Sequence, residues 1–396
     1  MRRFRKFLLY AMGVLFGLCF LLGAALAIGN LRLPQRSPAI ETLSEGDKIR
    51  LAEFLHLRQE MGERVWPGWS MVDIPAILYN EEYVFLIGYL DPQDGWVKVP
   101  QGIQRGGAWE PVPGDLFAGQ AYYRQRLSSP EETPEAFTVK VGDRWVSSMP
   151  TMDWFRIALS NQVREDLPAF VRPVFPYRIF TGQLVSGSEQ YISLSAHEAF
   201  HSFQGLMAPH KFAEAERINQ FEKDYPWDDR TLLMDWQTEL DVLVSALRAA
   251  DRDQTVGMVR EFLAVRASRR ESAGLSPELI SYEQYREWLE GLARYAELEI
   301  WRQALTDGYV PVPETAYLED FGDYTGFDRR WSQEVDQISR MATDEGDGRF
   351  YYSGMAQAVL LDRLLPDWKA RAFDENTWME ALLEEAIQEQ EGIARK

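Results

Sequence analysis

The sequence predicts an α+β protein in which an N-terminal transmembrane helix is followed by a small, mainly antiparallel β region and then by a mostly helical region. Three observations support this fold class. They are an uncharged apolar run at Phe7–Ile28, short segments rich in Ile, Val, Leu and Tyr between Gly and Pro residues at 71–150, and apolar residues at helical spacing from Ser193 onward. Strands in the first half and helices in the second half are typical of the α+β class.

The N-terminal segment has the features of a signal anchor. Met1–Lys6 is basic, and the apolar run that follows is about 20 residues long, enough to span a ~30 Å hydrocarbon core. The basic flank orients the N-terminus toward the cytoplasm and the body toward the extracytoplasmic side. Ala25-Leu26-Ala27 also fits a signal-peptidase site, so cleavage after Ala27 would give a secreted protein. Because a secretory apolar region is usually about 7–15 residues long, an uncleaved anchor through the lipid bilayer at residues 7–28 is favoured.

The chain is divided into four parts on these patterns. They are a signal anchor or transmembrane helix at 1–30, a linker and helix at 31–70, a β-rich region plus helix at 71–176, and a helical region at 177–396. The second part has helical spacing at Ile40–Glu63. In the third part, Asp73–Tyr79 and Tyr83–Leu90 are expected to pair as a hairpin.

The remaining elements follow from the same two periodicities. Further strands are expected at Trp96–Val99, Gln120–Arg126 and Phe137–Val146, with Tyr177–Leu184 as one more candidate strand. Helices are expected at Asp153–Leu167, Arg230–Ala250, Val256–Arg270, Ser281–Leu305 and Tyr352–Leu365. In the second of these helices, one stripe at helical spacing is formed by Leu232, Trp236, Leu240, Leu243 and Leu247.

Composition limits the class of partner. The formal net charge is −19, and residues 1–30 carry four basic and no acidic residues, so the body alone carries −23. Such a body is repelled by phosphates, and no nucleic-acid partner is expected. The single cysteine, Cys19, lies in the apolar run, which excludes a disulfide within the chain and a cysteine-based metal cluster in the body.

The segment His197-Glu198-Ala199-Phe200-His201 carries the strongest chemical signal. On a helix, residues i and i+4 lie on one face about one turn apart, so two imidazoles at this spacing reach one metal ion. Zn²⁺ suits nitrogen ligands. Glu198 is adjacent to the first histidine, where a carboxylate can act on a metal-bound water as general base. The neighbouring residues are largely apolar, and polar groups on a buried helix need partners, of which a metal ion is one.

A second segment, Trp288-Leu289-Glu290-Gly291-Leu292-Ala293-Arg294-Tyr295, resembles the second motif of the gluzincin-type zinc metallopeptidases. In that family a glutamate-glycine-x-alanine-x-tyrosine segment on a later helix supplies the third metal ligand. The resemblance implies that His197, His201 and Glu290 bind one catalytic Zn²⁺ and that Glu198 is the general base. It also implies a zincin-like catalytic region within residues 177–396.

The residues themselves leave an alternative for the third ligand. Glu239 lies on the first predicted helix after the histidine motif, at the edge of its apolar stripe, where a buried carboxylate needs a partner. His210 fits less well, because Gln204 and Met207 stand where the metzincin spacing requires glycine and histidine. Glu290 and Glu239 therefore both remain candidates from the sequence.

The predicted function is a membrane-anchored zinc hydrolase that cleaves a peptide or protein substrate with a zinc-bound water assisted by Glu198. Tyr352 and Tyr351 precede a predicted helix and are the candidate oxyanion donors, because gluzincins often use a tyrosine or histidine from their C-terminal part. The preference for peptide bonds follows from the resemblance. The alternative function is a non-catalytic zincin-like binding module presented outside the membrane, which would not require Glu198.

Overall fold

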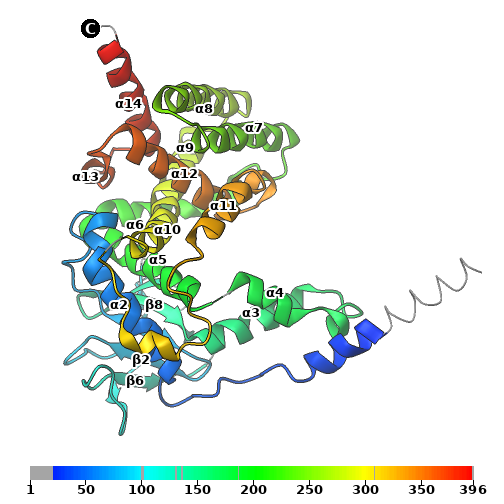
Figure 1. Ribbon diagram of the computed structural model, residues 1–396, viewed down its shortest axis with the longest axis vertical. Coiled ribbons are helices and arrows are strands. Elements are labelled where there is room, and N and C mark those ends of the chain that lie inside the picture. The colour runs from blue at the N-terminus through cyan, green and yellow to red at the C-terminus, as the bar shows by residue number, and fades with distance from the viewer. Residues whose placement is uncertain are drawn as a thin grey trace, which may run out of the picture.

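The computed structural model describes residues 21–99, 102–129, 132–134, 137–185, 187–306 and 308–394. Its architecture is α+β, with the strands at one end of the molecule and helices α7 and α8 at the other end (Figure 1). Helices α5, α10 and α12 are stacked between these two ends, whereas α3 and α4 project to one side (Figure 1). This stacking brings α5, α10 and α12 together in the middle of the molecule.

One curled sheet contains eight strands in the order β4-β3-β7-β8-β1-β2-β6-β5. All neighbouring strands are antiparallel except β1 and β8, which are parallel. The strands are β1 (Ala76–Tyr79), β2 (Tyr83–Ile87), β3 (Trp96–Lys98), β4 (Gln104–Arg105), β5 (Glu110–Pro111), β6 (Tyr123–Arg126), β7 (Phe137–Val141) and β8 (Arg144–Pro150). The expected hairpin forms between β1 and β2, where Asn80 Oδ1 accepts hydrogen bonds from the backbone N–H groups of Glu82 and Tyr83.

The helices begin with residues 21–30 and α2 (Glu45–Val65) and continue after the sheet. They are α3 (Met152–Asp166), α4 (Tyr177–Leu184), α5 (Ser188–Met207), α6 (Pro209–Ile218), α7 (Arg230–Leu247), α8 (Arg252–Ser272), α9 (Pro277–Arg286), the π turn η4 (Glu287–Gly291), α10 (Leu292–Ala304), α11 (Phe327–Ile338), α12 (Gly348–Leu364), α13 (Trp368–Ala372) and α14 (Met379–Ala394). Helix α5 packs on β7 and β8 on one side and on α2 and α10 on the other. Helix α12 in turn packs on α10 and on the π turn.

Aromatic packing fixes the rotation of α5 about its own axis. Trp66 and Trp69, which follow the end of α2, make edge-on contacts with the ring of Phe200 at centroid distances of 5.2 and 5.4 Å. Phe200 and Phe203 are fully buried in the core. On the same helix, His197 and His201 face Glu290 of the π turn, and His197 also faces Glu297 of α10.

Two predicted elements differ in the structure. Phe137–Val146 is not one strand, because Gly142 has a positive φ of 56° and turns the chain between β7 and β8. Tyr177–Leu184 is helix α4 rather than a strand. Its buried residues Tyr177 and Thr181 are four apart, which is helical spacing, and the Thr181 hydroxyl donates to the Tyr177 carbonyl at 2.9 Å.

The prediction of a transmembrane helix requires correction. Residues 7–20 of the predicted span lie outside the described residues, and the described residues 21–30 are helical. Among the described residues, no helix has both the length and the apolar character needed to cross a bilayer. On this finding, the transmembrane part of the predicted fold class and the predicted single-pass membrane localisation are withdrawn.

Candidate metal centre

Two histidines of α5 form the base of the candidate site. His197 and His201 lie one turn apart, and their side chains are 5% and 4% exposed. Their Nε2 atoms are 3.1 Å apart, and the two rings are nearly perpendicular. Two buried imidazole nitrogens that converge in this way define a point where one cation can contact both.

Glu290 reaches the same point from the π turn η4. Its Oε2 lies 3.6 Å from His197 Nε2 and 3.3 Å from His201 Nε2. A π turn widens a helix locally and is frequent at functional sites. The structure therefore brings Glu290 to the two histidines, and these three residues form a group that could hold a metal ion.

The spacing of the three atoms fits a tetrahedral zinc ion. Zn²⁺ binds histidine nitrogen and carboxylate oxygen at ~2.0–2.2 Å, which places tetrahedral ligand atoms roughly 3.3 Å apart. The three observed separations are 3.1, 3.3 and 3.6 Å. Within the described part of the chain, Glu290 Oε2 is buried without a hydrogen-bond partner, a costly state for a carboxylate oxygen that a bound cation would relieve.

The second ring nitrogen of each histidine faces a polar side chain. His201 Nδ1 lies 2.9 Å from Gln204 Oε1, and Gln204 Nε2 donates to the carbonyls of Trp288 and Leu289 at 2.8 and 3.1 Å. Gln204 thus joins one histidine directly to the backbone of the π turn. His197 Nδ1 lies 3.4 Å from Glu297 Oε2, two helical turns beyond Glu290. Such outer contacts fix the ring orientation of a metal-binding histidine.

The charge of the acidic cluster is balanced by buried arginines. Arg286 donates to Glu290 Oε1 at 2.8 Å and to Asp347 Oδ1 at 2.7 Å, and Arg294 donates to Glu297 Oε2 at 2.5 Å. Burial alone would raise the pKa of Glu297, but the Arg294 guanidinium lowers it to about 2. Glu297 therefore stays ionised beside His197 and can accept a hydrogen bond from its ring.

The two candidate tyrosines occupy different places. The Tyr351 ring is parallel to the His197 ring, with centroids 5.5 Å apart and an interplanar angle of 9°. Tyr352 lies over the Arg294 guanidinium at 5.7 Å, and burial raises its pKa to about 12. Of the pair, Tyr351 is therefore the one in direct contact with the histidine cluster.

Glu198, the candidate base, and Glu239, the alternative third ligand, differ in burial and in their contacts. Glu198 follows His197 on α5 and is only partly buried, and burial raises its pKa. Glu239 is fully buried on α7, where Arg266 Nε donates to Oε1 at 2.9 Å and Arg269 Nε donates to Oε2 at 2.6 Å. Both oxygens of Glu239 thus have arginine partners, and the structure does not bring Glu239 to the histidines.

Sequence reasoning did not single out Glu297, Gln204 or Arg286. A signal existed for the first of these, because Glu297 follows Glu290 by seven residues and therefore lies on the same helical face. No comparable signal marked Gln204, since its role depends on the backbone of a segment 84 residues away.

Comparisons with models of protein families, with curated proteins and with solved structures each found no match.

Proposed function

We propose that the protein is a zinc-dependent hydrolase that cleaves peptide bonds. The observation that supports this proposal most strongly is the convergence of His197 Nε2, His201 Nε2 and Glu290 Oε2 at tetrahedral ligand spacing. Three protein ligands leave a fourth position for water, which is typical of catalytic rather than structural zinc sites. The preference for peptide bonds rests on the resemblance of the two motifs to gluzincins.

The roles of the residues follow from their positions. Zn²⁺ held by the three ligands would polarise the scissile carbonyl and lower the pKa of a bound water to ~7. Glu198, adjacent to His197 and partly exposed, takes the proton from the attacking water and delivers it to the leaving amine. Gln204 and Glu297 hold the two imidazoles in place.

Tyr351 is the candidate donor to the carbonyl oxygen as it gains negative charge. Its ring is stacked on the ring of His197, so the side chain lies next to one of the candidate metal ligands. A phenol is protonated at neutral pH and can donate one hydrogen bond. Removal of one such donor typically costs about 10²–10³ in kcat. We therefore expect Tyr351→Phe to reduce kcat by this factor without loss of metal.

The first test is metal content by elemental analysis of the full chain. We expect about one zinc per wild-type chain, and loss of zinc in His201→Ala and in Glu290→Gln. Glu239→Gln is the matched control, because it removes a buried carboxylate of the same size that is held by arginines. A well-folded wild type that binds no zinc after metal supplementation would contradict the proposal.

The second test separates metal binding from turnover. Glu198→Gln keeps the shape of the side chain but cannot accept the proton, so it should retain zinc and lose hydrolysis of peptide substrates. Full activity in Glu198→Gln would overturn the assigned mechanism. Zinc binding without hydrolysis of any peptide by the wild type would favour the non-catalytic binding module.

A further inference from the structure

A large cavity lies at the N-terminal end of α5, outside the metal cluster. Its volume is about 900 Å³, and its walls come from α4, the start of α5, the segment 320–326, Trp301 and α11. Helices α4 and α11 face this region from opposite sides (Figure 1). One stripe of α11 and the residues just after it line the cavity, namely Arg329, Gln333, Asp336, Gln337 and Arg340.

The carboxylates of this cavity already have hydrogen-bond or ion-pair partners within the protein. Three acidic side chains line it, and each has a partner. The partners are the Gly322 N–H for Glu189, the Ser188 hydroxyl and Arg156 for Asp320, and Arg248 for Asp336. A cationic ligand would have to compete with these existing contacts.

Two arginines of the cavity are not neutralised. Arg330 is paired with Glu334 at 2.9 Å. By contrast, Arg329 and Arg340 are exposed, and their side chains make no ion pair or hydrogen bond with the described residues. The two uncompensated positive charges are notable in a chain of net charge −19. They select for an anionic ligand, and a guanidinium binds carboxylates in a bidentate manner.

The cavity is linked to the candidate metal centre through two side-chain contacts. Glu297 lies 3.4 Å from His197 Nδ1 and 3.8 Å from Arg330, so one buried carboxylate stands between a candidate metal ligand and a residue that lines the cavity. Gln190 lines the cavity and lies seven residues before His197 on α5, which corresponds to ~10 Å along the helix. An extended peptide covers ~3.3–3.6 Å per residue, so about three residues span this distance.

We propose that this cavity binds an acidic segment of the peptide substrate, with side-chain carboxylates held by Arg329 and Arg340. The placement of that segment about three residues from the cleaved bond rests on the proposed hydrolase function. The binding of an acidic peptide does not rest on it. Helix α11 rises ~14 Å from Arg329 to its end at Ile338, and Arg340 follows two residues later, so the two arginines contact carboxylates about four or more residues apart in an extended peptide.

The test measures binding separately from cleavage. The full chain carrying Glu198→Gln is titrated by calorimetry with a glutamate-rich octapeptide and with its glutamine counterpart, each with a free and an amidated C-terminus. We expect roughly tenfold or greater preference for the glutamate peptide, with little effect of amidation and weaker binding at high salt. Arg329→Gln and Arg340→Gln should each lower the affinity about tenfold. Arg126→Gln, on an exposed arginine of β6, is the control and should leave the affinity unchanged.

Equal affinity for the glutamate and glutamine peptides, or no effect of either arginine substitution, would overturn the inference. So would binding that is lost on amidation alone, because that result would mean recognition of the terminal carboxylate. If the wild type cleaves peptides without preference for acidic residues, the inference fails and the hydrolase function stands. If the acidic peptide binds but no peptide is cleaved, the hydrolase function fails and the acidic-peptide site stands.

Discussion

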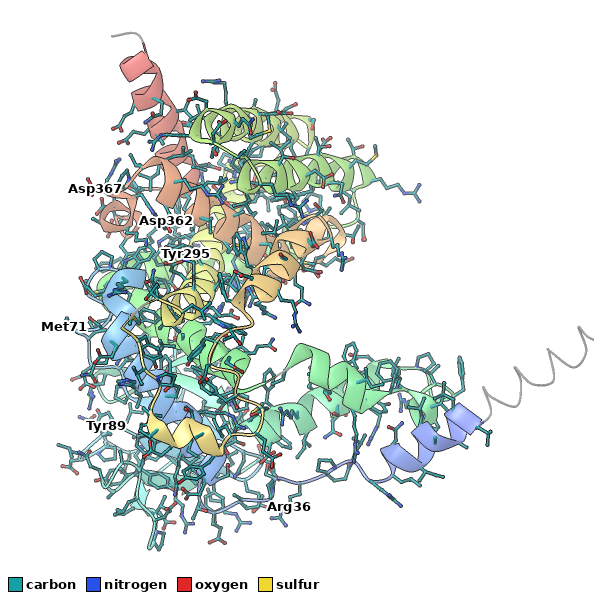
Figure 2. All side chains as sticks on the ribbon, viewed as in Figure 1. Arg36, Met71, Tyr89, Tyr295, Asp362 and Asp367 are labelled. Carbon is teal, nitrogen blue, oxygen red and sulfur yellow. The ribbon has the colours of Figure 1, made fainter. Side chains whose placement is uncertain are left out.

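Gly291 and Gly354 meet where the π turn crosses α12, and neither position has room for a side chain. A Cβ atom on Gly291 would collide with the Cα of Gly354, and a Cβ atom on Gly354 would lie 2.5 Å from the Glu287 carbonyl oxygen. This contact holds the π turn, which carries Glu290, close to α12, which carries Tyr351. Tyr295 supports the same crossing from α10, where its hydroxyl donates to Asp362 of α12 at 2.5 Å (Figure 2).

The glycine contact predicts a coupled loss of stability and metal affinity. Gly291→Ala forces the two backbones apart, and overpacking of this kind costs ~1–3 kcal/mol of unfolding free energy. Because Glu290 is the preceding residue, the affinity for Zn²⁺ should fall roughly tenfold. Urea unfolding and metal titration measure both effects. Gly257→Ala on α8 is the control, since a Cβ there meets no atom within 4 Å and should not destabilise the protein.

A substitution at Gln204 can separate its contact with His201 from its hydrogen bonds to the π turn. Gln204→Glu retains an acceptor for His201 Nδ1 but loses the amide donor to the carbonyls of Trp288 and Leu289. A carboxylate facing two carbonyl oxygens should displace the π turn and lower the affinity for Zn²⁺ by roughly 10–100-fold. Competition with a chelator of known affinity measures the change. Unaltered affinity would show that the link between Gln204 and the π turn is not needed for metal binding.

Metal removal should destabilise the wild type. A metal ion that binds only the folded state adds about 4 kcal/mol of stability when its concentration is a thousand times the dissociation constant. A chelator should therefore lower the melting temperature of the wild type by several degrees, as followed by calorimetry. His201→Ala should melt at one temperature with or without the chelator, because it cannot bind the ion tightly. Equal chelator effects in both proteins would place the bound metal elsewhere.

The histidine pair was predictable because local spacing alone determines its geometry. Residues 197 and 201 share a face on any helix, and the apolar residues around them indicate that the face is buried. The approach of Glu290 was not determined locally. It depends on the π turn and on the contact between Gly291 and Gly354, which lie 63 residues apart. Only the resemblance to gluzincins favoured Glu290 over Glu239 at the level of sequence.

Elements outside the site also differ in how far local sequence determines their structure. The β1–β2 hairpin follows from two apolar segments around Asn80, whose side chain closes the turn by itself. Tyr177–Leu184 is rich in residues that favour strands, yet it is helical because its buried residues follow a helical spacing. The predicted membrane anchor rested on the apolar length of the segment and its basic flank, and among the described residues no helix has the length and apolar character to cross a bilayer.

Glu239 belongs to a buried ionic cluster that also contacts the π turn. Arg266 and Arg269 bind Glu239. Arg266 also donates a hydrogen bond at 2.5 Å to Glu287, the first residue of the π turn. Ser353 of α12 donates to the same carboxylate at 2.6 Å. The cluster thus anchors the start of the π turn.

The lowered pKa of Glu380 on α14 predicts how the stability contributed by this cluster changes at low pH. Burial alone would raise its pKa, but Arg270 and Arg266, at 2.9 and 3.0 Å, lower it to about 2 from an ordinary 4.5. Its stabilising contribution is therefore complete above pH ~4.5 and is lost as the pH falls toward 2, and it is worth roughly 2–3 kcal/mol. Glu380→Gln should reduce the difference in unfolding free energy between pH 7 and pH 2.5 by about that amount. Glu385 lies on the same helix as Glu380 and forms a solvent-exposed pair with Arg371 of α13. Glu385→Gln should therefore change the difference by less than ~1 kcal/mol, and equal effects of the two substitutions would contradict the assignment.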